Sequence, residues 1–395
     1  MIAVSQEEYA GRVQKLQRHL QEKEIDLAIL NYNSDLYYYS GSVEPLYLIV
    51  PGKGQPLLLA RKAIRRIRDE VPHVPLAPFF GTKDLAAIIA DHGYAPAKTI
   101  AMTLSSATYA TVLRWQQLFG GANLADLSMD VRFIRMAKSG AELVIQREAG
   151  AIMAAVPDLV RNGFRPGMTE LQLSALIENY FRLNHHGILM RSRREGVELA
   201  YGVCSAGTNT LAGTKFDGIC SGRGVSNAMP YGANADVIPR GVPILLDYGF
   251  NLEGYHMDQT RMFCWGEPAP EVRRAYEAML KVEELIMENL KPRKLCSEIY
   301  QLALESAIES GYEKEFMGLG PEKVRFVGHG VGLELDEPPF LAPNNDYPLE
   351  AGMVVAVEPK VSLPDIGVVG IEDSMAVRNG KPELLTKAGR ELFVL

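Results

Sequence analysis

The chain contains 395 residues, enough for two or three domains at about 100–200 residues each. Hydrophobic residues make up 47% and charged residues 23%, a composition that is ordinary for a soluble globular protein. The formal net charge of −7 argues against a general nucleic-acid-binding protein, whose surface would be basic.

The start of the chain and its cysteines favour a cytoplasmic location. The opening sequence MIAVSQEEYAGR has no basic segment followed by an apolar one, as a signal peptide would. No apolar run approaches the roughly 20 residues that span a bilayer. The four cysteines form no CxxC pair, so we expect buried free thiols rather than a disulfide scaffold. We therefore predict a cytoplasmic protein that binds neither membranes nor nucleic acid.

The N-terminal third of the chain alternates between helical and strand patterns. Ser5 begins an S-x-x-E capping box, which predicts the start of a helix of about four turns. A short buried strand is expected over 26–30, and the segments 46–50 and 56–60 should pair as a hairpin. We predict that residues 1–135 form a compact α/β domain.

Longer helices and glycine-rich segments follow and build a second predicted domain, residues 136–395. One helix is expected over 141–161, and a second begins at Thr169, which can cap it. A glycine-rich stretch over 205–232 then leads into a strand at 243–247.

The same order recurs in the C-terminal part of the chain. Helices are predicted over 270–290 and 296–312, followed by glycines and a strand at 353–358. In both parts a glycine lies six residues before a carboxylate that ends an apolar strand, first Asp247 and then Glu358. This repeat predicts an α+β domain with two halves about a pseudo-two-fold axis, and both carboxylates near that axis.

Four carboxylates lie where charges are unusual. Asp247, Glu358 and Glu372 each follow an apolar run, and Asp258 lies on the returning arm of a hairpin that begins at Asp247. Any one of them could be paired with an arginine or capped by backbone N–H groups. Four converging carboxylates would instead repel one another, and divalent cations remove that cost.

His329 adds a nitrogen donor to this set. It lies in the segment Gly-His-Gly-Val-Gly, where glycines allow the backbone to approach a site closely. Taken alone, such a histidine is more often a turn or core residue than a ligand. Oxygen-rich ligation with one imidazole suits Mn, Co, Fe or Zn, and a pair of such ions can bind one hydroxide and polarise a carbonyl. We therefore predict a hydrolase with two divalent metal ions.

Five segments carry a resemblance to a known family: LLDYG, YHMDQTR, VGHGVG, VEPKV and GIED. They resemble the M24 metallopeptidases, the pita-bread family of methionine aminopeptidases, prolidases and Xaa-Pro aminopeptidases. Residues 1–135 resemble the creatinase-type N-terminal domain of the prolidase and aminopeptidase P branch. The resemblance thus covers nearly the whole chain, and it implies a homodimer with manganese or a similar ion.

The resemblance also implies roles for the five residues. Asp247 and Glu372 would help to hold both metal ions, Asp258 would bind one of them, and His329 with Glu358 the other. Glu358 would also be the general base that takes a proton from the metal-bound water, the source of the nucleophilic hydroxide.

The residues expected to face the substrate depart from the family pattern. The family usually has a histidine seven residues after its ligand histidine, where this chain has Asp336. A second family histidine is replaced by Tyr231, which can still donate a hydrogen bond, and the arginine before the last glutamate by Gly370. His256 has the same strand parity as Asp258 and is a further candidate for the pocket; a packed or exposed hairpin histidine is the alternative.

Three functions follow from these patterns. The first is a metallopeptidase that cleaves peptide C–N bonds as an Xaa-Pro aminopeptidase or dipeptidase. The second keeps the metal site but acts on a small non-peptide amide or related substrate, as the three departures would allow. The third is a metal-binding pseudoenzyme, which the complete ligand set argues against.

Overall fold

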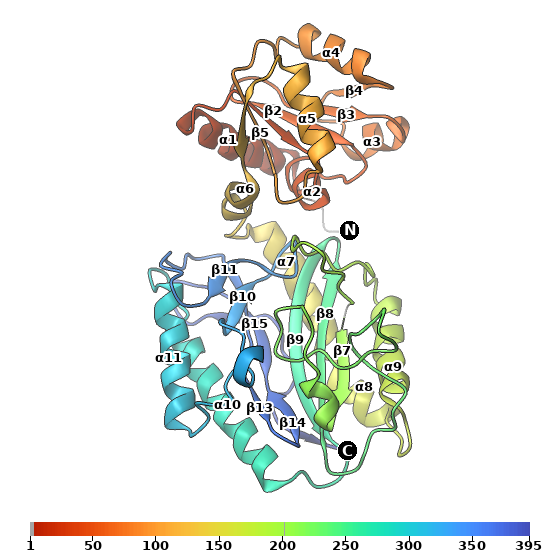
Figure 1. Ribbon diagram of the computed structural model, residues 1–395, viewed down its shortest axis with the longest axis vertical. Coiled ribbons are helices and arrows are strands. Elements are labelled where there is room, and N and C mark those ends of the chain that lie inside the picture. Colours follow the sequence, from red (N-terminus) through yellow and green to blue (C-terminus); the bar gives the residue numbers. More distant parts are fainter. Residues whose placement is uncertain (1–3, 201) are drawn as a thin grey trace. The chain divides into compact units, whose positions relative to one another are not determined.

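The computed structural model describes residues 4–200 and 202–395, which form two compact units (Figure 1). Unit 1 comprises Met1–Arg135 with Arg193–Glu195, and unit 2 comprises Met136–Ser192 with Gly196–Leu395. Within the described residues, no helix is both long enough and apolar enough to cross a membrane.

Unit 1 is built on a six-stranded sheet in the order β4-β3-β2-β1-β5-β6. Its strands are β1 (Leu27–Leu30), β2 (Tyr47–Pro51), β3 (Leu57–Ala60), β4 (Leu76–Pro78), β5 (Thr99–Met102) and β6 (Asn123–Asp126). Its helices are α1 (Gln6–Glu22), α2 (Asn33–Ser40), α3 (Ile64–Glu70), α4 (Thr82–Asp91), α5 (Tyr109–Leu118) and α6 (Ser128–Ile134). The antiparallel pairing of β2 with β3 confirms the predicted hairpin.

The start of α1 follows directly from its sequence. The Ser5 Oγ accepts a hydrogen bond from the Glu8 N–H at 3.2 Å, which satisfies one of the free donors of the first turn. Val13, Leu16 and Leu20 then share one buried face, as their spacing predicts.

Unit 2 is built on a curled nine-stranded sheet, whose main path is β11-β10-β12-β15-β9-β8-β7. Its first strands are β7 (Gly202–Ala206), β8 (Pro243–Leu252), β9 (Tyr255–Cys264), β10 (Gly328–Gly330), β11 (Glu337–Leu341) and β12 (Val354–Val357). The remaining strands are β13 (Lys360–Leu363), β14 (Gly367–Gly370), β15 (Glu372–Ala376), β16 (Glu383–Leu384) and β17 (Phe393–Val394). Strands β13 and β14 form a separate antiparallel pair.

The helices of unit 2 are α7 (Gly140–Met153), α8 (Val156–Gly163), α9 (Glu170–Leu183), α10 (Pro270–Asn289) and α11 (Cys296–Glu309). In Figure 1, α9 lies beside β7, while α10 and α11, in cyan, lie beside β14 and β11. Helices α8 and α9 precede β7–β9, and α10 and α11 precede β10–β12. The predicted α+β domain with two halves is therefore confirmed.

The single helix predicted over 141–161 is wrong. The chain forms α7 and α8 instead, with a break at residues 154–155. Pro157 lies in the first turn of α8. It has no N–H to donate to the Met153 carbonyl, and its ring would collide with that carbonyl in a continuous helix.

Glu383 joins the C-terminal strands to α7 and has a predictable effect on stability. Its carboxylate accepts hydrogen bonds from Arg147 Nε and Nη2 at 2.5 and 3.0 Å, and it also pairs with Arg378. The bond from Arg147, together with that from Arg378, outweighs partial burial and lowers the pKa of Glu383 to about 2.

We expect Glu383→Gln to lower the free energy of unfolding at pH 7 by about 1–2 kcal/mol, after allowance for solvent screening. Because the folded-state pKa lies below the usual 4.5, the stabilisation is present above pH 4.5 and is lost as the pH falls toward 2. Urea unfolding from pH 7 to pH 3 measures the difference. The exposed pair of Arg161 with Glu391 gives the control, Glu391→Gln, and an equal loss in both variants would contradict the prediction.

Candidate metal centre

Three polar side chains lie in one row across the sheet of unit 2. Thr260 on β9 is paired with Asp247 on β8 and, on its other side, with Glu372 at the start of β15. Residues that are paired across neighbouring strands point to the same face of the sheet. Asp247 and Glu372, which are far apart in sequence, are therefore on the same face, with Thr260 between them.

The other predicted ligands reach the same face by strand parity. Asp258 lies two residues before Thr260 on β9, so both side chains point the same way. Glu358 directly follows β12, whose last residue Val357 is paired with Asp373, so Glu358 continues opposite Glu372. His329 on β10 is paired with Ala356, which has the same parity as Glu358.

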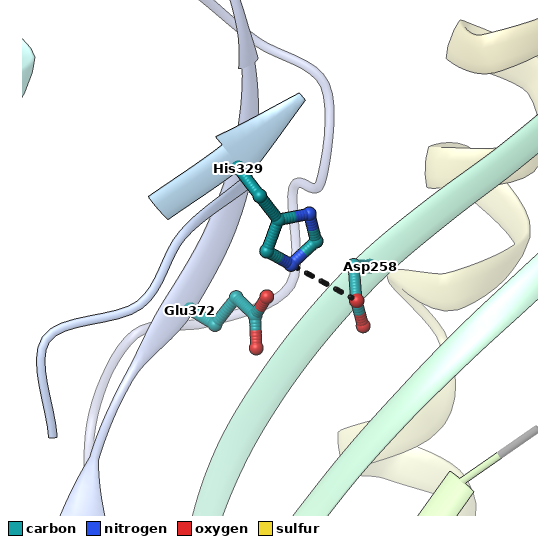
Figure 2. Close-up of side chains that lie close together, drawn as sticks. All are labelled: Asp258, His329 and Glu372. Carbon is teal, nitrogen blue, oxygen red and sulfur yellow. Dashed lines mark ion pairs between the residues drawn. The ribbon is translucent and has the colours of Figure 1, made fainter. Parts of the chain in front are cut away.

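These side chains converge on one small volume. Figure 2 shows Asp258, His329 and Glu372 pointing toward one another, and their donor atoms all lie within 4.8 Å of each other. His329 Nε2 is 3.9 Å from Asp258 Oδ2 and 3.6 Å from Glu358 Oε1. The four side chains are buried. Three carboxylates and one imidazole in this arrangement are a donor set that fits a divalent transition-metal ion.

Lys360, which the sequence analysis did not identify as a site residue, lies among the same carboxylates. Its Nζ is 2.6 Å from Glu358 Oε2, 3.0 Å from Glu372 Oε2 and 3.3 Å from Asp247 Oδ2. Its side chain is 0% exposed. Lys360 lies two residues after Glu358 in extended chain, so both side chains point in the same direction.

Two smaller groups complete the surroundings of the carboxylates. The Thr260 hydroxyl donates to Glu372 Oε2 at 2.7 Å, and the Cys220 thiol donates to Asp247 Oδ2 at 3.3 Å. Burial raises the pKa of the Cys220 thiol well above its usual value, so the thiol keeps its proton and its donor role.

The electrostatics of the cluster are those of crowded, buried carboxylates. Burial raises the pKa of Asp258 well above its usual value, and the charges of Glu372, Asp247 and Glu358 add to the rise. Burial also raises the pKa of Glu372 to about 8, against the opposing influence of Lys360. Burial by itself lowers the pKa of Lys360, yet the surrounding carboxylates raise it well above its ordinary range. The cluster therefore favours bound cations.

Gly370 makes room for the lysine. It is paired with Lys360 across β13 and β14. A Cβ atom at position 370 would lie 2.5 Å from Lys360 Cγ and 2.5 Å from the Pro359 carbonyl oxygen. No side chain larger than hydrogen fits there while the lysine stem lies over this position.

We expect Gly370→Ala to destabilise the protein by about 1–3 kcal/mol, the usual cost of overpacking a buried position. Thermal and urea unfolding measure the effect. Gly380→Ala is the matched control, because a Cβ atom at that exposed glycine would meet nothing within 4 Å. If the two variants were equally stable, the close packing of residue 370 on Lys360 would be contradicted.

The structure places the other predicted site residues as follows. Tyr231 is half-buried and lines a cavity of about 620 Å³ together with Glu198 and Lys215. Asp336 is buried in the connection between β10 and β11. Among the residues that the structure describes, Asp336 is not one of the converging donors Asp258, His329 and Glu372.

His256 is fully buried, and both of its ring nitrogens have partners. Nδ1 lies 2.9 Å from the Gly332 carbonyl oxygen, and Nε2 accepts from the Arg191 N–H at 3.1 Å and lies 3.2 Å from Asn251 Nδ2. Burial lowers the pKa of His256 to about 4, so the ring is neutral near pH 7. These bonds tie the segment around Arg191 to β9.

Comparison with known families agrees with this architecture. Residues 145–379 match metallopeptidase family M24, and residues 12–137 match the creatinase/prolidase N-terminal domain. The M24 match alone covers more than half of the chain and includes all five predicted ligands. The chain therefore belongs to metallopeptidase family M24, and it is a metal-dependent hydrolase.

Individual relatives extend over the full length. The Xaa-Pro dipeptidase of Pyrococcus furiosus is 26% identical over 391 residues, covering 97% of this chain and 99% of the relative. The solved Xaa-Pro dipeptidase from Bacillus anthracis has a TM-score of 0.82 at 23% identity, covering 98% of this chain and 100% of that one. The X-Pro aminopeptidase from Thermotoga maritima has a TM-score of 0.79 at 23% identity, covering 97% and 99%. These structures share the pita-bread fold expected from the sequence.

Proposed function

We propose that this metallopeptidase cleaves the peptide bond before proline, as an Xaa-Pro aminopeptidase or dipeptidase. The observation that carries the proposal is the end-to-end match with a relative named Xaa-Pro dipeptidase, across both predicted domains. We assign the chemistry to residues 136–395 and an accessory role to the creatinase-like domain, residues 1–135.

We assign the metal-binding role to the converging donors Asp258, His329 and Glu372, with Glu358 beside them. The mixture of carboxylates and one imidazole suits manganese, cobalt, iron or zinc, and we favour manganese. A divalent ion bound there would polarise the scissile carbonyl and acidify a water molecule.

We assign the proton transfer to Glu358. Its Oε2 atom is held by Lys360 at 2.6 Å, while its Oε1 atom lies on the side of His329. A carboxylate fixed in this way can accept a proton from the attacking water and pass it to the leaving nitrogen. Tyr231 is assigned as a hydrogen-bond donor to the substrate, and His256 positions the segment around Arg191 rather than touching the substrate.

A second candidate substrate is a small non-peptide amide. It is favoured by Asp336, a carboxylate at the position where the family usually has a histidine that contacts the scissile bond. An anionic group there disfavours the developing oxyanion of a peptide, unless the carboxyl group is protonated or turned away.

We also infer a cytoplasmic homodimer. All four cysteines are free and buried, which suits a reducing compartment. Light scattering on the purified protein tests the oligomeric state: a dimer mass is expected, and a monomer mass would contradict it.

The substrate assignment is tested with peptides that differ only in proline or alanine at the second position. Manganese-loaded protein should cleave the Xaa-Pro members faster, whether they are dipeptides or longer. A metal-loaded preparation that cleaves none of them but hydrolyses small amides would replace the prolyl assignment by the second candidate. If Asp336 and Tyr231, which replace the two family histidines, limit prolyl activity, the double variant Asp336→His, Tyr231→His should cleave Xaa-Pro peptides faster than the unmodified protein.

A further inference from the structure

We propose that the Lys360 ammonium group takes the place of one of the two expected divalent cations, so that each chain holds a single metal ion at Asp258, His329 and Glu372. This inference rests on the proposed metal-dependent function and deepens it, because it fixes the number of ions. It replaces the expectation of a two-metal site that the sequence motifs raise.

The Lys360 nitrogen lies among three carboxylates. It contacts one oxygen of each of three carboxylates, Glu358 at 2.6 Å, Glu372 at 3.0 Å and Asp247 at 3.3 Å. The ammonium group donates hydrogen bonds to Glu358 and Glu372 and forms an ion pair with Asp247. A second divalent ion would need the same oxygens, so the ion and the ammonium group compete for one place.

The cluster of carboxylates has two sides, one at Lys360 and one at His329. Glu358 directs Oε2 to Lys360 and Oε1 toward His329 Nε2, 3.6 Å away. Glu372 contacts Lys360 and also belongs to the converging group with Asp258 and His329. Glu358 and Glu372 therefore lie between two groups. Lys360 and Asp247 lie on one side of them, and His329 and Asp258 lie on the other.

Lys360 is shielded from solvent. Its side chain is 0% exposed, and its stem lies over Gly370, where even a Cβ atom would be 2.5 Å from Lys360 Cγ. The glycine at position 370 and the lysine at position 360 thus form one packed unit.

The formal charge of the cluster also favours a single divalent ion. Asp247, Asp258, Glu358 and Glu372 with one lysine carry a formal charge of −3, which one divalent ion reduces to −1. Two divalent ions beside the buried lysine would bring the formal charge to +1, with three carboxylate oxygens already engaged by the ammonium group. One divalent ion leaves the cluster anionic, whereas two would make it cationic.

The test is a count of bound manganese in the intact protein, with no reliance on activity. Metal-free protein is titrated with Mn²⁺ and followed by calorimetry, elemental analysis and electron paramagnetic resonance. Two ions at the spacing of about 3.5–4 Å that dinuclear sites adopt would couple magnetically, whereas a single ion gives the hyperfine spectrum of an isolated centre. The unmodified protein should bind one ion per chain with the isolated spectrum.

Two variants remove the ammonium charge, Lys360→Met and Lys360→Gln. Each should bind two ions per chain and give a coupled spectrum, because the oxygens around the former ammonium position become available. Lys138→Met is the matched control: Lys138 is another fully buried lysine, paired with Glu337 at 2.9 Å, and its loss should leave the count at one.

The possible outcomes separate the inference from the function it rests on. Two coupled ions in the unmodified protein would overturn the inference and leave the metal-dependent function intact. One ion in the unmodified protein and still one in both folded Lys360 variants would also overturn it. An unmodified protein that binds no ion would contradict the proposed function, and the inference with it. One ion that becomes two in either Lys360 variant supports the inference.

Discussion

Glu358→Gln is expected to lower kcat by about 10²- to 10⁴-fold, the usual contribution of a positioned general base. Glutamine has the shape of glutamate and can still accept a hydrogen bond from Lys360, but it cannot take a proton from water. The carboxylate is well placed for this role, since one oxygen is held at 2.6 Å from Lys360 Nζ and the other faces His329. Steady-state hydrolysis of the preferred Xaa-Pro peptide measures the effect.

The loss should be confined to turnover. If Glu358 acts mainly as a base, KM changes little and the variant still binds manganese, which calorimetry can verify. Glu383→Gln removes a carboxylate that lies outside the cluster, bonded to Arg147 and Arg378, and should retain its activity. A Glu358→Gln variant with nearly full kcat would assign the proton transfer to another residue.

His329→Ala is expected to weaken manganese binding by more than about 100-fold and to abolish hydrolysis at ordinary metal concentrations. Substitutions of groups that only support a metal ligand already cost about 10–100-fold in affinity, so loss of a ligand should exceed that. His329 supplies the nitrogen donor of the converging group, within 4.8 Å of the Asp258 and Glu372 oxygens. Calorimetric titration of metal-free protein measures the affinity.

A histidine in the other unit provides the comparison. His19 also lies beside a carboxylate, with Nε2 2.8 Å from Asp130 Oδ1, so His19→Ala removes an imidazole from a similar pair. Its metal affinity and activity should match those of the unmodified protein. Tight manganese binding by His329→Ala would mean that the ion is held elsewhere.

The location of the site could be predicted because charged residues lie next to apolar strands, where apolar residues are expected. Asp247 and Glu358 end apolar strands, where a charge needs a partner, and the repeat relates one to the other. The strand pairing that brings the carboxylates together could not be predicted from the repeat. Asp247 and Glu372 meet through Thr260, a register that depends on strand order and cannot be read from spacing within one segment.

Lys360 could not be distinguished from an ordinary surface residue in the sequence. Lysines are almost always solvent-exposed, so a lysine after Glu-Pro carries no sign of burial. Its placement depends on the pairing of β13 with β14, which brings Gly370 against it from ten residues further along the chain. The break between α7 and α8 was readable from Pro157, a residue that the prediction of one continuous helix did not take into account.

The contact between Lys360 and Gly370 also limits how this centre can be re-engineered. An arginine at position 370 would collide with the lysine stem, so Gly370→Arg should give an unstable protein. Removing the stem does not clear the position, because the Pro359 carbonyl oxygen and the Cα atom of residue 360 would still lie 2.5 and 2.6 Å from a Cβ atom at position 370. Moving the cation from position 360 to position 370 therefore requires a shift of the backbone of β13 and β14, and not only an exchange of two side chains.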